Sequence, residues 1–78
     1  MRAASSVDSV LTAAEAAYNT ERYTEAAEMI ESFLAKHPSE RNFTLCYNLG
    51  NAYYRTGQMG KAILNYERAL RYKPEDQA

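Results

Sequence analysis

The feature that most constrains this chain is an internal repeat with an offset of 36 residues. Residues 25–38 realign on residues 61–74, so that Ala26 lies opposite Ala62 and Pro38 lies opposite Pro74. A constant offset over an apolar pattern indicates two equivalent structural units that follow one another. One such unit cannot cover its own apolar face, so the repeat predicts that the two units stack.

Four blocks of apolar residues recur at helical spacing, and no segment alternates with the period of two that marks a strand. The blocks lie at residues 7–18, 23–34, 43–53 and 59–70. We therefore predict an all-α fold with four helices. Because the segments between the blocks are short, consecutive helices are expected to be antiparallel and to form two hairpins.

Residues that favour helix ends separate these blocks. Ser5 or Ser6 is predicted to cap the first helix, and Ser39 is predicted to cap the third. Gly57 follows the third block, where a positive φ angle carries no Cβ penalty. Pro74 lies just past the fourth block, where the chain is expected to leave the helix.

Gly50 lies inside the third predicted helix, where glycine costs about 1 kcal/mol relative to alanine. We therefore expect a neighbouring backbone to come too close there for a larger side chain. Ala62 is predicted to be the small partner on the facing helix. Tyr53 and Tyr66 are predicted to fill the space beside this close approach.

The second unit resembles the tetratricopeptide repeat (TPR) pattern over nearly its whole length. The matching residues are Cys46, which replaces a tryptophan, and then Leu49, Gly50, Tyr53, Ala62, Tyr66, Ala69 and Pro74. The first unit fits less closely, because its first helix carries Val10, Ala13, Ala14 and Ala17 at the corresponding places. The resemblance implies two antiparallel helix-turn-helix hairpins whose four helices form a right-handed superhelical stack.

This resemblance also sets the expected boundaries. Repeat one is predicted at about residues 7–38 and repeat two at about residues 41–76, within a single domain of residues 1–78. Repeats of this family run 34 residues, so the longer offset predicts two extra residues near Ser39 to Asn42. We expect them to add a half turn at the start of the third helix.

A narrower resemblance covers the run from Cys46 to Leu70, which looks like the repeat region of Bat-type aerotolerance-operon proteins. Proteins of that type are larger and membrane-associated. This resemblance implies that the chain is a fragment of a membrane-associated TPR scaffold, in the periplasm or at the membrane face. Taken as complete, the chain is instead expected to be cytoplasmic, because no stretch approaches the roughly 20 apolar residues of a membrane span.

Composition limits the chemistry that the chain can support. With one cysteine and one histidine, it has no internal disulfide and no Cys and His set for zinc. His37 is expected in an exposed turn, Cys46 in the core, and the glutamates at 21, 25, 28 and 31 on a solvated face without the paired environment of a catalytic carboxylate. The glycines at 50, 57 and 60 are expected to serve packing and capping rather than a phosphate loop. We therefore predict a non-catalytic protein without metal or cofactor.

The resemblance implies that the chain binds a peptide or protein segment in a concave groove lined by the first helix of each repeat. Tyrosine offers large contact area at low entropic cost, and asparagine can pair with both donors and acceptors of a peptide backbone. The predicted groove residues are Leu11, Glu15, Tyr18, Tyr47, Asn48, Asn51, Tyr54 and Arg55. The alternative for the tyrosines and asparagines of the third helix is helix packing or plain solvation. Because Leu11 and Tyr47 occupy the places of the family's clamp lysine, a dedicated receptor for C-terminal carboxylates is not expected.

Self-association, as a homodimer or by head-to-tail stacking, is the alternative function. Two repeats are marginal where about three are usually needed, and the fourth helix would leave an uncovered face at Ile63, Leu64, Tyr66 and Leu70. The charged residues behind the formal net charge of −1 are also unevenly distributed along the chain. Residues 1–40 carry a net charge of −4 and residues 41–78 a net charge of +3, which suits either solvated helix faces or head-to-tail attraction.

The remote alternative is nucleic-acid binding by the basic second unit, which the overall negative charge disfavours.

Overall fold

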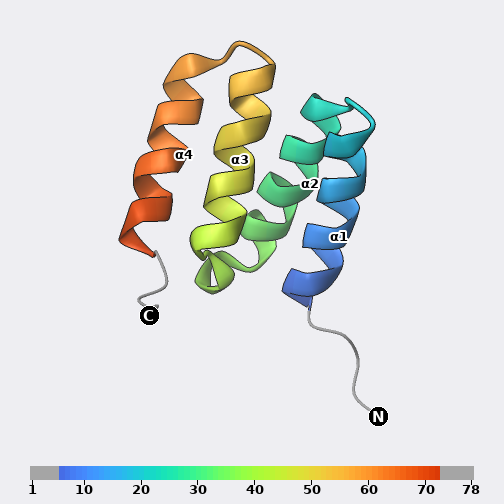
Figure 1. Ribbon diagram of the computed structural model, residues 1–78. Coiled ribbons are helices and arrows are strands. Elements are labelled where there is room, and N and C mark those ends of the chain that lie inside the picture. Colours follow the sequence, from blue (N-terminus) through green and yellow to red (C-terminus); the bar gives the residue numbers. More distant parts are fainter. Residues whose placement is uncertain (1–5, 73–78) are drawn as a thin grey trace, which may run out of the picture.

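The computed structural model describes residues 6–72 and contains four α-helices over that range (Figure 1). They are α1 (Ser6–Asn19), α2 (Tyr23–Lys36), α3 (Phe43–Arg55) and α4 (Met59–Arg71), with a 3-10 turn, η1 (Pro38–Glu40), between α2 and α3. The residues described include no strand, and the all-α prediction is confirmed. The predictions for Ser5 and Pro74, and for the Ser6 side chain, concern atoms outside the described part.

The helices lie side by side in chain order as two hairpins (Figure 1). α1 packs against α2, α2 also packs against α3, and α3 also packs against α4. Each inner helix is therefore covered on two sides, whereas α1 and α4 form the two ends of the stack. This end position decides which apolar faces meet water.

The two hairpin turns have the same hydrogen bonds, which extends the repeat to the backbone. After α3, the Gln58 N–H donates to the Tyr53 carbonyl over 2.9 Å and the Gly57 N–H to the Tyr54 carbonyl over 3.1 Å. The equivalent bonds after α1 are 2.8 and 3.0 Å long and are donated by the N–H groups of Arg22 and Glu21. This pair of bonds is the Schellman arrangement, whose capping residue takes a positive φ.

That capping residue is Gly57 in the second turn, with φ of 82°, as predicted. Its repeat equivalent in the first turn is Glu21, with φ of 66°. A residue with a Cβ atom is strained in this conformation by roughly 1–2 kcal/mol. The first turn therefore keeps the geometry of the second without the residue that favours it.

The prediction that Ser39 caps the third helix is wrong. Ser39 lies within η1, and Asn42 is the N-cap, with its Oδ1 accepting a 2.8 Å hydrogen bond from the Leu45 N–H. The extra residues between the repeats form this separate 3-10 turn rather than lengthening α3. Pro38 favours such a turn because its fixed φ suits a first helical position and its nitrogen needs no partner. The cap therefore moves to the last polar residue before Phe43.

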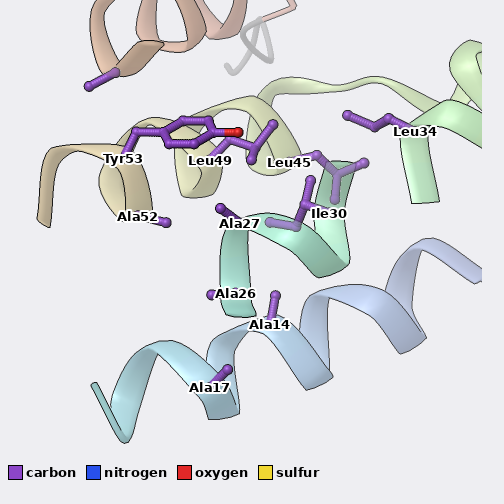
Figure 2. Packing of buried hydrophobic residues seen from close by; sticks show 11 residues of the cluster. Ala14, Ala17, Ala26, Ala27, Ile30, Leu34, Leu45, Leu49, Ala52 and Tyr53 are labelled. Carbon is purple, nitrogen blue, oxygen red and sulfur yellow. The ribbon is translucent and has the colours of Figure 1, made fainter. Parts of the chain in front are cut away.

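The core runs through the interfaces between neighbouring helices (Figure 2). Its largest fully buried side chains are Ile30, Leu45, Leu49 and Cys46. Near α1 the core is built from small residues, with Ala14 and Ala17 facing Ala26 of α2. The burial of Cys46 agrees with its prediction as a core residue.

Gly50 is required by a side chain and not, as predicted, by a neighbouring backbone. A Cβ atom added to Gly50 would lie 2.5 Å from two ring carbons of Tyr66. At the equivalent place in the first repeat the pair is Ala14 and Ile30, and both are buried. The glycine is therefore matched to the tyrosine ring. Gly60 has open space around its Cβ position, and nothing in the structure explains a glycine there.

Candidate functional site

A cleft of about 270 Å³ lies between α1 and α3, with α2 as its floor. Four of the predicted groove residues line it: Glu15, Tyr18, Asn48 and Asn51. The remaining lining residues are Ala14, Asn19, Ala26 and Ile30. The cleft therefore has an apolar floor with three amide side chains and one carboxylate around it.

Asn51 is held by a hydrogen bond from the second helix of its own hairpin. The Tyr66 hydroxyl donates to the Asn51 Oδ1 over 2.6 Å. Burial is the main cause that raises the pKa of Tyr66, followed by the charge of Tyr47, so the hydroxyl stays protonated as a donor at neutral pH. Among the residues described, the Nδ2 group has no hydrogen-bond partner of this kind to hold it, and with its two protons it can donate to a ligand.

An aromatic and cationic cluster joins three helices beside the cleft. The rings of Tyr18 and Tyr23 meet edge to face at 5.0 Å, and the Arg55 guanidinium lies 4.7 Å from the centre of the Tyr23 ring. A hydrogen bond with Tyr18, then the charge of Tyr23, raises the pKa of Arg55. Arg55 does not line the cleft. It instead connects α3 to the aromatic residues of α1 and α2 beside the cleft.

The other predicted groove residues lie elsewhere. Leu11 is half-buried and packs against the core. Tyr47 stacks on Phe43 at 5.6 Å and contacts the Tyr66 ring at 5.8 Å, on the side of α3 that faces α4. Tyr54 is 57 % exposed and does not line the cleft. The exposed surface of α3 is therefore divided, with its asparagines toward α1 and Tyr47 toward α4.

A second hollow of about 400 Å³ lies on the flank of α3 and α4. Its lining is almost entirely apolar and consists of Phe43, Tyr47, Tyr66, Ala69 and Leu70. Of the residues predicted for self-association, Ile63, Leu64 and Leu70 are exposed, whereas Tyr66 is half-buried beneath Gly50.

Sequence reasoning missed two parts of the cleft. It did not include Ala26 and Ile30, because their apolar character indicates only a core position, and the cleft exposes the edge of that core. It also assigned Tyr66 to space filling, although the hydroxyl orients Asn51. A buried tyrosine usually finds a hydrogen-bond partner, and this rule was the available signal.

The residues considered for catalysis have structural contacts. His37 is exposed and packs its ring on Phe33 at 4.9 Å. The glutamates at 21, 25, 28 and 31 are all exposed, as predicted. The Glu31 Oε2 accepts a 2.6 Å hydrogen bond from the Tyr53 hydroxyl, and Glu25 pairs with Arg22 at 2.9 Å. Within residues 6–72, no three acidic, His or Cys side chains gather as a metal site.

None of the helices described is both long and apolar enough to cross a membrane. Comparison with curated proteins and with solved structures gives no match. The family model described as tetratricopeptide repeat matches residues 11–78. This match covers both hairpins and agrees with their shared turns and with the spacing of the second repeat. The chain belongs to the tetratricopeptide repeat family.

Proposed function

We propose that this chain binds an extended peptide segment in the cleft between α1 and α3. Repeats of its family are generally protein-protein interaction modules. The observation that supports the proposal best is the pairing of Asn51 with Tyr66, which leaves the amide donor of Asn51 to the cleft. A peptide carbonyl is the complementary acceptor, and Asn48 offers a second amide one helical turn earlier.

The lining of the cleft also indicates which peptides it favours. Glu15 is the charged residue among the lining side chains, and no lysine or arginine is among them. A carboxylate in a partly enclosed site attracts a lysine or arginine side chain and repels a C-terminal carboxylate. We therefore expect internal segments with a basic residue to bind better than acidic or C-terminal ones.

Selection from a displayed library of random internal peptides tests this function. The sharpest variant is Asn51→Asp, because it has the same shape and keeps an acceptor for the Tyr66 hydroxyl but replaces the donor group by an acceptor. We expect selected peptides to bind this variant about tenfold more weakly or worse. Glu15→Gln should reduce the preference for basic residues.

A matched control is Glu28→Gln, the same exchange at an exposed glutamate of α2 outside the cleft. This variant should bind the selected peptides as well as wild type does. When wild type is titrated with a selected peptide, the changes in backbone amide chemical shifts should centre on Glu15, Tyr18, Asn48 and Asn51. The proposal is wrong if no peptide is enriched, or if the selected peptides bind wild type and Asn51→Asp equally well.

Two narrower functional assignments follow from the sequence and the family. A role as part of a membrane-associated Bat-type scaffold, in the periplasm or at the membrane face, is a proposal from the sequence resemblance. The absence of catalysis is likewise a prediction, to which the family's usual role as an interaction module lends support.

A further inference from the structure

The outward surface of α4 is the most apolar exposed part of the described chain. We define the outer face of α4 as Ile63, Leu64 and Leu70, which are 57 %, 44 % and 65 % exposed. The described residues contain seven large hydrophobic side chains that are exposed. Six of them lie in the second hairpin, and the seventh is Tyr72, directly after it. The first hairpin, with the same repeat, exposes none.

The repeat shows what kind of neighbour this surface fits. Shifted back by 36 residues, Ile63 coincides with Ala27. In the same way, Leu70 coincides with Leu34. Both residues of α2 are buried, at 4 % and 3 % exposure, on the side of α2 that faces α3 (Figure 2). Ile63 and Leu70 therefore occupy the positions against which the next helix packs in the first repeat, whereas Leu64 coincides with the exposed Glu28 at the edge of that contact.

The other end of the stack has the opposite half of this arrangement. The α3 residues that lie fully buried at the repeat interface are Leu45, Leu49 and Ala52. Their equivalents in α1 are Ser9, Ala13 and Ala16, all of them exposed. We define these three as the outer face of α1. Because its side chains are small, bulky residues of a neighbouring helix can approach its backbone closely.

The charges of the two end helices are complementary. α4 carries three basic residues and one acidic residue, a net charge of +2. α1 carries Asp8 and Glu15 and no basic residue, a net charge of −2. Contact between α4 and α1 of two molecules therefore pairs opposite charges, whereas contact between two α4 helices pairs like charges.

We propose that the outer face of α4 binds the outer face of α1 of a second copy of this chain, head to tail. Large side chains of one molecule then lie against small ones of the next, in the register that the α2–α3 interface already uses. Since the two surfaces differ and lie at opposite ends, each added copy leaves one of each free. The stack therefore lengthens with concentration and does not stop at a symmetric dimer.

Sedimentation analysis of the full chain over a range of concentrations tests this proposal. Wild type should show an average mass that rises continuously and falls when salt is added, because the paired charges are exposed. Ile63→Glu with Leu70→Glu removes the α4 surface, and Ala13→Arg blocks the α1 surface. Each variant alone should associate about tenfold more weakly or worse, and both alter exposed positions only.

Mixing the two variants separates head-to-tail contact from its alternatives. The double glutamate variant keeps its α1 surface, and Ala13→Arg keeps its α4 surface. These two intact surfaces can bind each other, so the mixture should form one-to-one heterodimers and nothing larger. Thr12→Arg is the matched control, since it adds the same charge to α1 next to the docking surface, at the repeat equivalent of the cleft residue Asn48. It should associate much more strongly than Ala13→Arg and only slightly more weakly than wild type, because it leaves the docking surface free and changes only the net charge of α1.

Several results would overturn the proposal. A wild type that is monomeric at all concentrations shows that copies do not cover α4. An Ala13→Arg variant that still dimerises shows a symmetric α4 contact instead. A mixture that forms no heterodimers shows that α4 of one copy does not bind α1 of another, provided that thermal unfolding shows both variants folded. Peptide binding in the cleft is measured separately, so its failure leaves this result unaffected.

Discussion

The α1–α2 hairpin and the α3–α4 hairpin have the same repeat and the same turn geometry, but they differ in how many of their large apolar side chains are exposed to water. In the first hairpin, α1 packs with small residues such as Ala14 and Ala17, α2 buries Ile30 and Leu34, and no large apolar residue is exposed within the described range. The second contributes Leu45 and Leu49 to the core and leaves large residues such as Leu70 in water. The difference shows that place in the stack, and not the repeat itself, decides what becomes core.

Leu34 and Leu70 give the sharpest test of this comparison, because they are the same residue at equivalent positions. Leu34 is 3 % exposed and Leu70 is 65 % exposed. Leu34→Ala should lower the free energy of unfolding by about 2–4 kcal/mol through lost burial and a cavity. Leu70→Ala should change it by less than about 0.5 kcal/mol. Urea unfolding at the lowest workable protein concentration measures both, and equal effects would refute the role of stack position.

Gly50→Ala should destabilise the fold by about 1 kcal/mol. The new Cβ atom clashes with the Tyr66 ring, which is tied to Asn51 by its hydroxyl, and the cost of overpacking exceeds the gain in helix propensity. Copying the first repeat should remove the clash, because Ala14 there faces Ile30. In a Tyr66→Ile background, Gly50→Ala should therefore become stabilising. Thermal unfolding of the four proteins checks this, and an unchanged sign would show that the ring is not the obstacle.

Tyr53→Phe should cost about 1 kcal/mol at neutral pH, because it removes the hydrogen bond to the Glu31 carboxylate between the two hairpins. The first-repeat equivalent, Ala17, has no such bond to lose. Unfolding by urea measures the cost. A loss below the error of the measurement would mean that water replaces the carboxylate's partner without penalty.

The same tyrosine makes stability depend on alkaline pH. Burial, followed by the hydrogen bond to Glu31, raises the pKa of Tyr53 above its ordinary value of 10.0, and burial also raises that of Tyr66. The unfolded chain therefore releases these protons first, so stability is complete below about pH 10 and declines as the pH rises further. Tyr53→Phe should make this decline in stability shallower. Tyr66 should account for part of the decline that remains in this variant. A stability that rises above pH 10 would contradict the shifts.

The smallest effect is expected at the two turns. Glu21→Gly should raise the free energy of unfolding by about 0.5 kcal/mol, because glycine relieves the positive φ but costs more chain entropy. Gly57→Ala should lower it, since alanine is strained at that φ in spite of open space around its Cβ. Melting temperatures of both variants measure the difference. Shifts of the same sign would show that the turns are not equivalent.

Much of the fold could be predicted from the sequence because its signals are local. Apolar spacing predicted the four helices, and the offset predicted their equivalence. The Ser39 cap was predicted wrongly, since several polar residues precede α3 and only the 3-10 turn selects Asn42. For the candidate site, one helical face of α3 could be identified, but not its division between Asn51 beside α1 and Tyr47 beside α4.

By itself, then, the sequence determined the helices, their pairing into hairpins and the repeat that places this chain in its family, because periodicity and turn chemistry act between residues close in the chain. Only the tertiary structure decided that Leu34 is core and Leu70 is surface, that Gly50 makes room for Tyr66, and that the Tyr66 hydroxyl binds Asn51 beside the cleft. The physical reason is that burial and hydrogen-bond partners depend on which helix lies alongside, and the end helices of a stack have a neighbour on one side only.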